Sequence, residues 1–125
     1  MTRHTISSGS PWEGPYGYSR AIAVGDQCWV AGTADPTGRH PGDAAGQARE
    51  ILGIIERALA EAGFGLADVV RTRMYVTNAS DAPAVASVHG EVFGAIRPAS
   101  ALVVVAALIA PELLVEIEVD AVRAP

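Results

Sequence analysis

Three acidic residues near the end of the chain are spaced so that they could share chemistry. Glu116, Glu118 and Asp120 alternate with apolar residues from Val115 to Ala121. Residues two apart in a strand point to the same face, so the carboxyl groups form a row with a spacing of about 7 Å. Like charges repel at that spacing, and partial burial raises a carboxyl pKa toward the range useful for proton transfer. The row therefore predicts an acid–base site or, more simply, one side of a set of ion pairs.

The ion-pair interpretation depends on a second alternating segment, Val69 to Thr77. Its apolar positions alternate with polar ones, which is typical of a half-buried strand. Arg71 and Arg73 lie on the polar face and could pair across the sheet with the acidic row. For Glu116 and Asp120 we favour this simpler interpretation.

Other elements can be placed upstream. Arg20–Val24 and Gln27–Thr33 are predicted strands, and Gly25-Asp26 between them is a short hairpin signal. The clearest helix covers roughly Asp43 to Ala62, because apolar residues recur there at helical spacing. Its stripe consists of Ala48, Ile51, Leu52, Ile55, Ala58, Leu59 and Ala62.

A second helix is expected after Ser80, which can cap it, and its apolar stripe includes His89. Pro98 stops this helix, and two predicted strands follow, Ala101–Leu108 and Leu114–Ala121. The predicted order is ββ(β)-α-β-α-β-β, and each helix carries one apolar stripe. This pattern predicts an α+β two-layer sandwich, in which both helices cover one face of a mixed β-sheet.

Length and composition restrict the possible functions. A chain of 125 residues predicts one domain, covering residues 1–125. A net charge of −5 argues against a nucleic-acid partner, because such proteins carry clustered positive charge. We find no membrane-length apolar window and no leader-like run, so we expect a cytoplasmic protein without a membrane partner. All nine basic residues are Arg, which excludes an internal lysine Schiff base and, with abundant Ala and Gly, indicates a GC-rich bacterial genome.

Metal and cofactor chemistry are not expected. His4, His40 and His89 lack the spacing of metal ligands, and Cys28 is the single cysteine. Because Cys28 lies within a hydrophobic strand, we expect a buried, inert thiol. The sequence contains no phosphate-binding loop, dinucleotide fingerprint or nucleophile elbow.

Seven short segments occur in a characteristic order: Gly14–Ala21, Val30–Thr33, Ala58–Val76, Phe93-Gly94, Pro98-Ala99, Val105–Leu108 and Val115–Glu118. In this order and spacing they resemble the reactive intermediate deaminase family, also called the Rid or YjgF family. The resemblance covers nearly the whole chain. It implies a chorismate-mutase-like fold, a homotrimer with ligand pockets between subunits, and hydrolytic deamination of small imines.

The resemblance also implies roles for individual residues. Glu118 matches the family glutamate that positions or activates the attacking water, so for this residue we favour a catalytic role. Tyr18, with Tyr16 as the alternative match, would either hydrogen-bond a ligand or pack at a subunit interface. Gly32 matches a glycine whose backbone contacts the substrate, and a plain bulge is the alternative. Trp12 would either line the pocket or anchor its loop.

Ser100 is the main departure from the family pattern. In deaminating members an arginine follows the Pro98-Ala99 pair and grips the substrate carboxylate. A serine donates one hydrogen bond but cannot supply that charged, two-pronged grip. Ala86 and Leu102 also stand where deaminating relatives carry polar residues. Arg97 could substitute for the missing arginine, but as the residue before a proline it is expected at the surface. We therefore predict a more apolar, less anion-selective pocket with Ser100 among its ligand contacts.

His89 is the last candidate substrate-binding residue. A lone histidine on an apolar stripe is usually a satisfied core or interface residue, and the alternative is a neutral imidazole beside Glu118 as an acid–base pair. Two functions fit these residues. One is an enzyme acting on a small imine, enamine or carbonyl metabolite by deamination, isomerisation or cyclisation. The other is a non-catalytic, trimeric small-molecule-binding or regulatory protein. Ribonuclease activity fits poorly with the acidic charge.

Overall fold

A six-stranded mixed sheet forms the centre of the protein, in the order β1-β2-β3-β6-β4-β5. The computed structural model describes residues 2–124. Neighbouring strands are antiparallel, apart from the parallel pair β4 and β5. The strands are β1 (Arg3–Ile6), β2 (Ala21–Val24), β3 (Gln27–Thr33), β4 (Val69–Val76), β5 (Ala99–Val104) and β6 (Val115–Val122).

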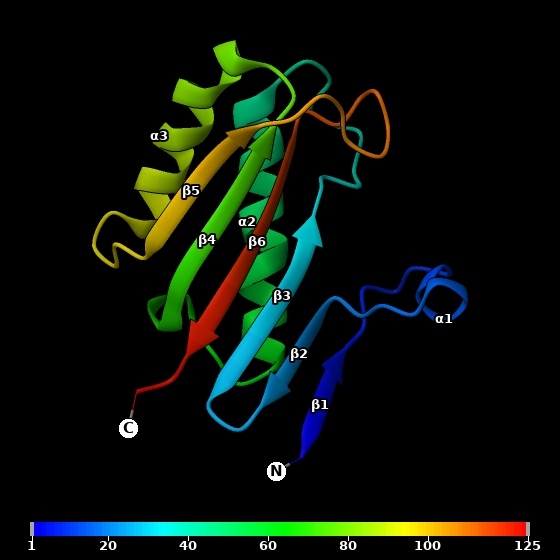
Figure 1. Cartoon of the computed structure of the whole chain (residues 1–125), viewed down its shortest axis with the longest axis vertical. Helices are drawn as coiled ribbons and strands as arrows, with labels where there is room; N and C mark the ends of the chain where they lie inside the picture. Colours follow the sequence, from blue (N-terminus) through cyan, green and yellow to red (C-terminus); the bar gives the residue numbers. More distant parts are fainter. Residues whose placement is uncertain (1, 125) are drawn as a thin grey trace.

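The two long helices, α2 (Ala44–Glu61) and α3 (Ala82–Phe93), both pack on one face of this sheet (Figure 1). This arrangement confirms the predicted α+β two-layer sandwich. Three shorter helical segments connect the larger elements: α1 (Glu13–Tyr16), η1 (Leu66–Asp68) and η2 (Ala79–Asp81). None of the helices in residues 2–124 combines the length and apolar character that crossing a bilayer requires.

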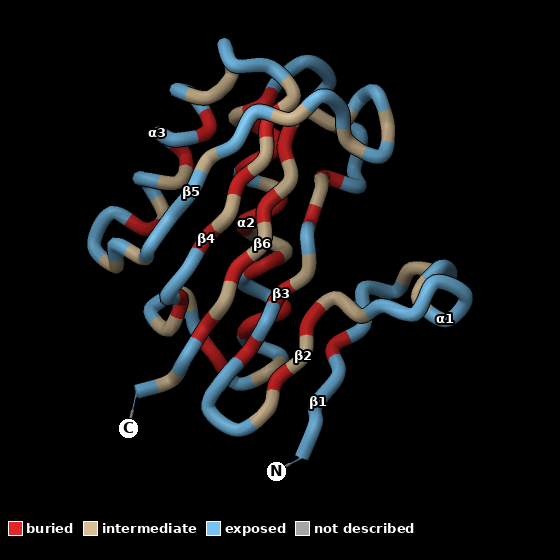
Figure 2. The backbone as a smooth tube through the Cα atoms, viewed as in Figure 1, coloured by how far each residue is buried: buried red, intermediate tan, exposed pale blue. Residues whose placement is uncertain are grey.

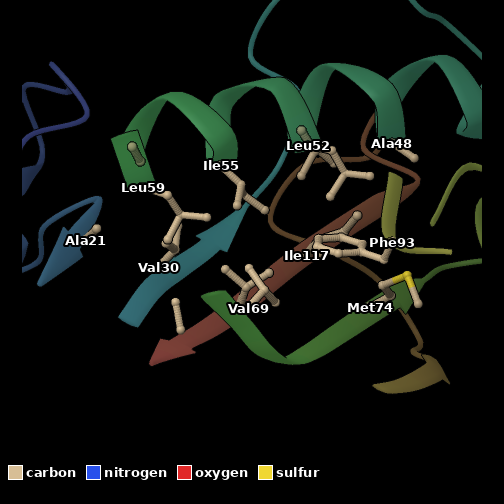
Figure 3. Packing of buried hydrophobic residues seen from close by; sticks show 14 of the residues in the cluster. Ala21, Val30, Ala48, Leu52, Ile55, Leu59, Val69, Met74, Phe93 and Ile117 are labelled. Carbon is tan, nitrogen blue, oxygen red and sulfur yellow. The ribbon is translucent and has the colours of Figure 1, made fainter. Parts of the chain in front are cut away.

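The core lies between the sheet and the helices, and the other sheet face is left open. In β6, residues that face the helices are buried, and residues between them are only partly buried (Figure 2). Ile55 and Leu59 of α2 are in the same buried cluster as Val30 of β3 and Ile117 of β6 (Figure 3). Cys28 belongs to this core and burial raises its thiol pKa, as expected for an inert cysteine.

Helix α2 agrees with the prediction because its ends carry clear signals. The Asp43 side chain caps the helix by accepting a hydrogen bond from the Gly46 backbone N–H at 2.9 Å. Beyond its C-terminus, Gly63 adopts φ +87°, a conformation that glycine takes without strain.

The predicted cap of the second helix is wrong. Asn78, not Ser80, opens the turn before α3: its Oδ1 accepts hydrogen bonds from the Ser80 N–H and from the Ser80 hydroxyl. The Ser80 hydroxyl is therefore occupied as a donor, and α3 begins at Ala82, after the short η2 turn.

The bounds predicted for the penultimate strand are also wrong. Strand β5 begins two residues earlier than Ala101 and ends at Val104. Its parallel pairing with β4 stops at the Val76–Val104 pair, because β4 itself ends there. The apolar residues beyond Val104 form a loop that leads to β6.

A buried glutamine ties this loop to α2. The side-chain amide of Gln47 donates to the backbone carbonyls of His40 and Glu112, both at 3.1 Å, and its oxygen accepts from the Leu114 N–H at 2.9 Å. Gln47 therefore holds the chain immediately before β6, the strand that carries the acidic row.

Candidate functional site

Strand β6 places its acidic row on the open face of the sheet. Glu116, Glu118 and Asp120 are partly buried, and the alternate residues between them are fully buried against the helices. The predicted shared face is therefore confirmed. The surroundings of the three carboxyl groups differ.

Glu118 is oriented by Tyr75 of the neighbouring strand β4. The Tyr75 hydroxyl donates a short hydrogen bond to Glu118 Oε1. This bond to the carboxylate is the main reason why the pKa of Tyr75 is raised, so the phenol stays protonated and remains a donor. Arg73 lies directly opposite Glu118 in the sheet register. Both residues line a cavity of about 480 Å³ on the open face, together with Trp29.

Asp120 pairs with an arginine across the sheet, as the simpler interpretation predicted. Its Oδ2 lies 3.5 Å from Arg73 Nη1, and both side chains are partly exposed. Such a pair contributes little to stability, on the order of 0–1 kcal/mol. Its effect here is local, because it holds the Arg73 guanidinium beside the Glu118 cavity.

Glu116 does not follow that interpretation, since no ion pair or hydrogen bond of its carboxylate is found within residues 2–124. Its pKa is raised, first by burial and then by the Glu118 carboxylate. It lines a cavity of about 490 Å³ that also includes Tyr18, Arg20 and Gly32.

Gly32 lies at an irregularity where the β3–β6 register shifts between Val30 and Thr33. A Cβ at this position would stand 2.8 Å from Glu116 Oε2, closer than real Cβ contacts allow. The glycine is therefore explained by a bulge and by the Glu116 carboxylate beside it. Its role in contacting a substrate stays a prediction.

Tyr18 and Trp12 both lie in the loop between β1 and β2. The Tyr18 hydroxyl donates to Ser10 Oγ at 2.8 Å, and the ring borders both the Glu116 cavity and a neighbouring one of about 570 Å³. Trp12 stacks on Tyr16 at 5.4 Å and is 56% exposed, which makes it an anchor within the loop. The ligand roles predicted for both residues stay predictions.

Ser100 and His89 lie on the opposite face of the sheet from Glu118, next to α3. Thr72 of β4 connects them: its hydroxyl donates to Ser100 Oγ at 2.7 Å and lies 2.8 Å from His89 Nε2. His89 is partly buried, which lowers its pKa and keeps the imidazole neutral, and its ring packs 4.8 Å from that of Phe93. The pairing of His89 with Glu118, considered from the sequence, is not formed within the chain.

The candidate residues therefore form two groups. Glu118, Tyr18 and Gly32 lie on or beside the open face, and Ser100 with His89 lies at the β5 edge on the helix side. Strand β6, which carries Glu118, is two strand spacings from β5, about 10 Å, and the two groups lie on opposite faces of the sheet. One copy of the chain thus does not bring both groups to a single small ligand.

Sequence reasoning missed two residues of these groups, Thr72 and Tyr75. Both belong to the alternating segment that became β4, so the face of each could be predicted. Their partners Glu118, Ser100 and His89 depend on register, which the sequence does not specify. Within the described residues, His, Cys, Asp and Glu form no cluster of three or more that could hold a metal ion.

The fold and the open face, with its oriented carboxylate, define a class of two-layer α+β proteins with chorismate-mutase-like architecture. A family model described as Endoribonuclease L-PSP matches residues 13–123. The chain belongs to this family, the Rid or YjgF family.

Individual relatives support this family assignment. The crystal structure of Rv2704 from Mycobacterium tuberculosis, described as a member of the YjgF/YER057c/UK114 family, is 51% identical with a TM-score of 0.91, covering 98% of this chain and 100% of that one. Protein SCO2049 of Streptomyces coelicolor is 40% identical over 121 residues, 94% of this chain and 90% of its own. The 3-aminoacrylate deaminase RutC of Acinetobacter baylyi is 40% identical over 78 residues, 62% of this chain and 61% of its own.

Proposed function

We propose that this protein hydrolyses a small imine or enamine to a carbonyl compound and ammonia. The reaction takes place in a pocket that a second copy of the chain completes within a homotrimer. The ligand is a small metabolite that needs no carboxylate for recognition.

The orientation of Glu118 carries this proposal. One oxygen of its carboxylate accepts the Tyr75 hydrogen bond, so the other is free to accept a proton from water. The group faces a cavity on the open side of the sheet, and the Arg73 guanidinium lines that cavity too. A fixed, solvent-accessible carboxylate suits a general base for water.

The chemistry balances with this one base, once an enamine has taken a proton from solvent at its β-carbon and become a protonated imine. Water gives a proton to Glu118, and its oxygen bonds to the carbon of a protonated imine, whose π electrons move to nitrogen. The product is a carbinolamine. Glu118 then returns the proton to the amine, the hydroxyl proton leaves, and the C–N bond breaks to release ammonia.

The second copy is proposed because the two residue groups are separated within one chain. Apolar side chains remain exposed along the sheet: Trp29 is 43% exposed, Val103 45% and Val104 52%. An oligomer would cover such side chains and bring the β5 edge of one copy to the open face of the next.

The substrate class is supported by two observations. Ser100 offers a hydroxyl, already bonded to Thr72, where a guanidinium would grip an anion. RutC, similar over 78 residues, is described as a deaminase of 3-aminoacrylate, an enamine. We therefore expect the reaction type to be shared and the preference for a carboxylate to be weaker.

The test compares two imine panels made in situ. An amino-acid oxidase supplies 2-imino acids, and a flavin monoamine oxidase supplies uncharged imines. Semicarbazide traps the imine that the protein has not hydrolysed. We expect wild type to remove uncharged imines faster than 2-imino acids. Glu118→Gln should lose about 100-fold or more of this activity, and Glu56→Gln, an exposed change on α2, should lose none.

Ser100→Arg restores the missing cation, so we expect it to bind 2-imino acids more tightly and to lower the KM for them. A wild type that removes no imine or enamine would overturn the proposed activity. If it then binds these compounds in equilibrium dialysis, the non-catalytic binding function replaces the enzyme.

A further inference from the structure

A continuous chain of hydrogen bonds runs from the β5 edge into the protein. Ser100 is exposed, Thr72 is fully buried and His89 is partly buried. The distances are 2.7 Å between the two hydroxyl oxygens and 2.8 Å between Thr72 Oγ1 and His89 Nε2. These hydrogen bonds thus link the exposed Ser100 hydroxyl to the partly buried His89 imidazole.

The parallel register of β4 and β5 creates this contact. Thr72 and Ser100 are register partners, so both side chains point toward α3. Helix α3 presents His89 above them and fixes its ring against Phe93. Three different elements therefore hold the three groups in line.

The hydrogen bonds of this row can all point in one direction or all in the other, because each hydroxyl has a single hydrogen to donate. When His89 Nε2 carries a proton, it donates to Thr72, which donates to Ser100, and the Ser100 hydrogen points outward. When Nε2 is bare, Thr72 donates to it, Ser100 donates to Thr72, and the Ser100 oxygen accepts from outside. Switching from the second direction to the first moves one proton from an external group to His89.

We infer that Ser100, Thr72 and His89 form a proton relay that removes the hydroxyl proton of the carbinolamine bound against β5. Ser100 touches the intermediate, and Thr72 and His89 are positioning residues behind it. The inference deepens the proposed function and rests on it for the identity of the ligand. It assigns the two protons of the attacking water to different groups, the first to Glu118 and the second to the relay.

The step balances as follows. The carbinolamine oxygen gives its proton to Ser100, Ser100 gives its own to Thr72, and Thr72 gives its own to His89 Nε2. The oxygen lone pair then forms the C=O bond, and the C–N electrons leave with ammonia. After the product leaves, the imidazolium returns its Nε2 proton through Thr72 and Ser100 to water, which restores the bare Nε2 for another turnover.

The surroundings of His89 favour a neutral imidazole, which accepts a proton at Nε2 when its own hydrogen is on Nδ1. Burial lowers its pKa. Strand β5 carries no titratable residue, and Arg71 and Arg73 of β4 project to the opposite sheet face from Thr72. The other titratable residue of α3, Glu91, pairs with Arg49 of α2 at 3.3 Å.

The first test needs no substrate. With ¹⁵N-labelled histidine, NMR reports the tautomer of neutral His89 in the full-length protein. In wild type, both tautomers should be populated. Ser100→Ala removes the acceptor beyond Thr72, so Thr72 should donate only to His89. The His89 tautomer without a hydrogen on Nε2 should then become more populated. An unchanged His89 spectrum in Ser100→Ala would overturn the relay, whatever the protein does with imines.

The second test measures turnover of the imines that wild type hydrolyses. Thr72→Val, which keeps the shape and loses the hydroxyl, should lower kcat by about 100-fold with little change in KM. Thr72→Ser keeps the hydroxyl and should retain most activity. In the pH profile, the acid limb due to His89 should be present in wild type and absent in Thr72→Val.

The matched control for Ser100→Ala is Ser87→Ala, an exposed serine on α3 that should leave kcat unchanged. If wild type hydrolyses imines and Thr72→Val does so at the wild-type rate, the relay has no part in the reaction. If wild type hydrolyses none, the proposed function fails, and the NMR result still decides whether the relay exists.

Discussion

The carboxylate of Glu116 occupies the space that a side chain at Gly32 would need. A Cβ on Gly32 would lie 2.8 Å from Glu116 Oε2 and 3.1 Å from its carboxyl carbon. The glycine and the glutamate therefore belong to one local arrangement, in which neither can be changed without affecting the other.

Gly32→Ala should cost about 1 kcal/mol of unfolding free energy, because the Glu116 carboxylate must move out of a partly buried position. In a Glu116→Ala background the same substitution should cost almost nothing, which gives a coupling of about 1 kcal/mol in a double-mutant cycle. Urea unfolding measures all four proteins. Gly90→Ala is the control, because nothing lies within 4 Å of its added Cβ. Equal costs in both backgrounds would contradict the arrangement.

Glu116 should make the stability of the protein depend on pH. Its folded-state pKa is raised above the ordinary 4.5, mainly by burial. The carboxyl group is thus best accommodated when protonated, and its stabilising effect is lost as the pH rises through the folded-state pKa. Glu116→Gln should therefore gain stability over wild type as the pH rises from about 4 toward 7. A stability difference that stays constant over this range would show that Glu116 titrates normally.

Tyr75 should titrate late in alkali, since its hydrogen bond to Glu118 raises its pKa above the ordinary 10. Absorbance at alkaline pH should show a late step that disappears in Tyr75→Phe. This variant should lose about 0.5–1.5 kcal/mol of stability, the usual net contribution of one hydrogen bond. In the imine assay it should also lose activity, because the Glu118 carboxylate is less fixed. Tyr16→Phe, an exposed change, serves as the control for the late alkaline step and for stability.

Gln47→Leu should be among the more destabilising changes outside the apolar core, at about 3 kcal/mol. It removes the partners of two backbone carbonyls and of the Leu114 N–H, all tied to a side chain that is only 4% exposed. Thermal unfolding followed by circular dichroism measures the loss. Gln27→Leu, at an exposed position in β3, should be nearly neutral. A loss no larger than that of this control would mean that the loop is held by other contacts.

Much of the fold could be predicted because its signals are local. The apolar stripe of α2 and the alternation in β6 depend only on residues close in sequence, and both are confirmed. The cap before α3 was predicted wrongly for a local reason as well. Asn78 and Ser80 are both good capping residues, and sequence alone did not show that the serine donates to the asparagine.

The candidate site was less predictable because it depends on register. The row of acids on β6 followed from period-two alternation, but the Tyr75 partner of Glu118 and the Thr72 partner of Ser100 follow from how strands align. A shift by one residue would bring different side chains together. The early end of β5 has the same origin, because a strand extends only as far as its neighbour offers pairing groups.

The position of Ser100 on an edge strand has a consequence for how this protein could diverge. In β5, residues 99, 100, 101, 103 and 104 are exposed, and pairing comes from one side only. A new side chain at position 100 can turn toward solvent without entering the apolar core, so the scaffold should tolerate changes here that break only the hydrogen bond to Thr72. A saturation library at position 100 should therefore give mostly folded proteins, which separates the effect of this residue on ligand binding and turnover from its effect on stability.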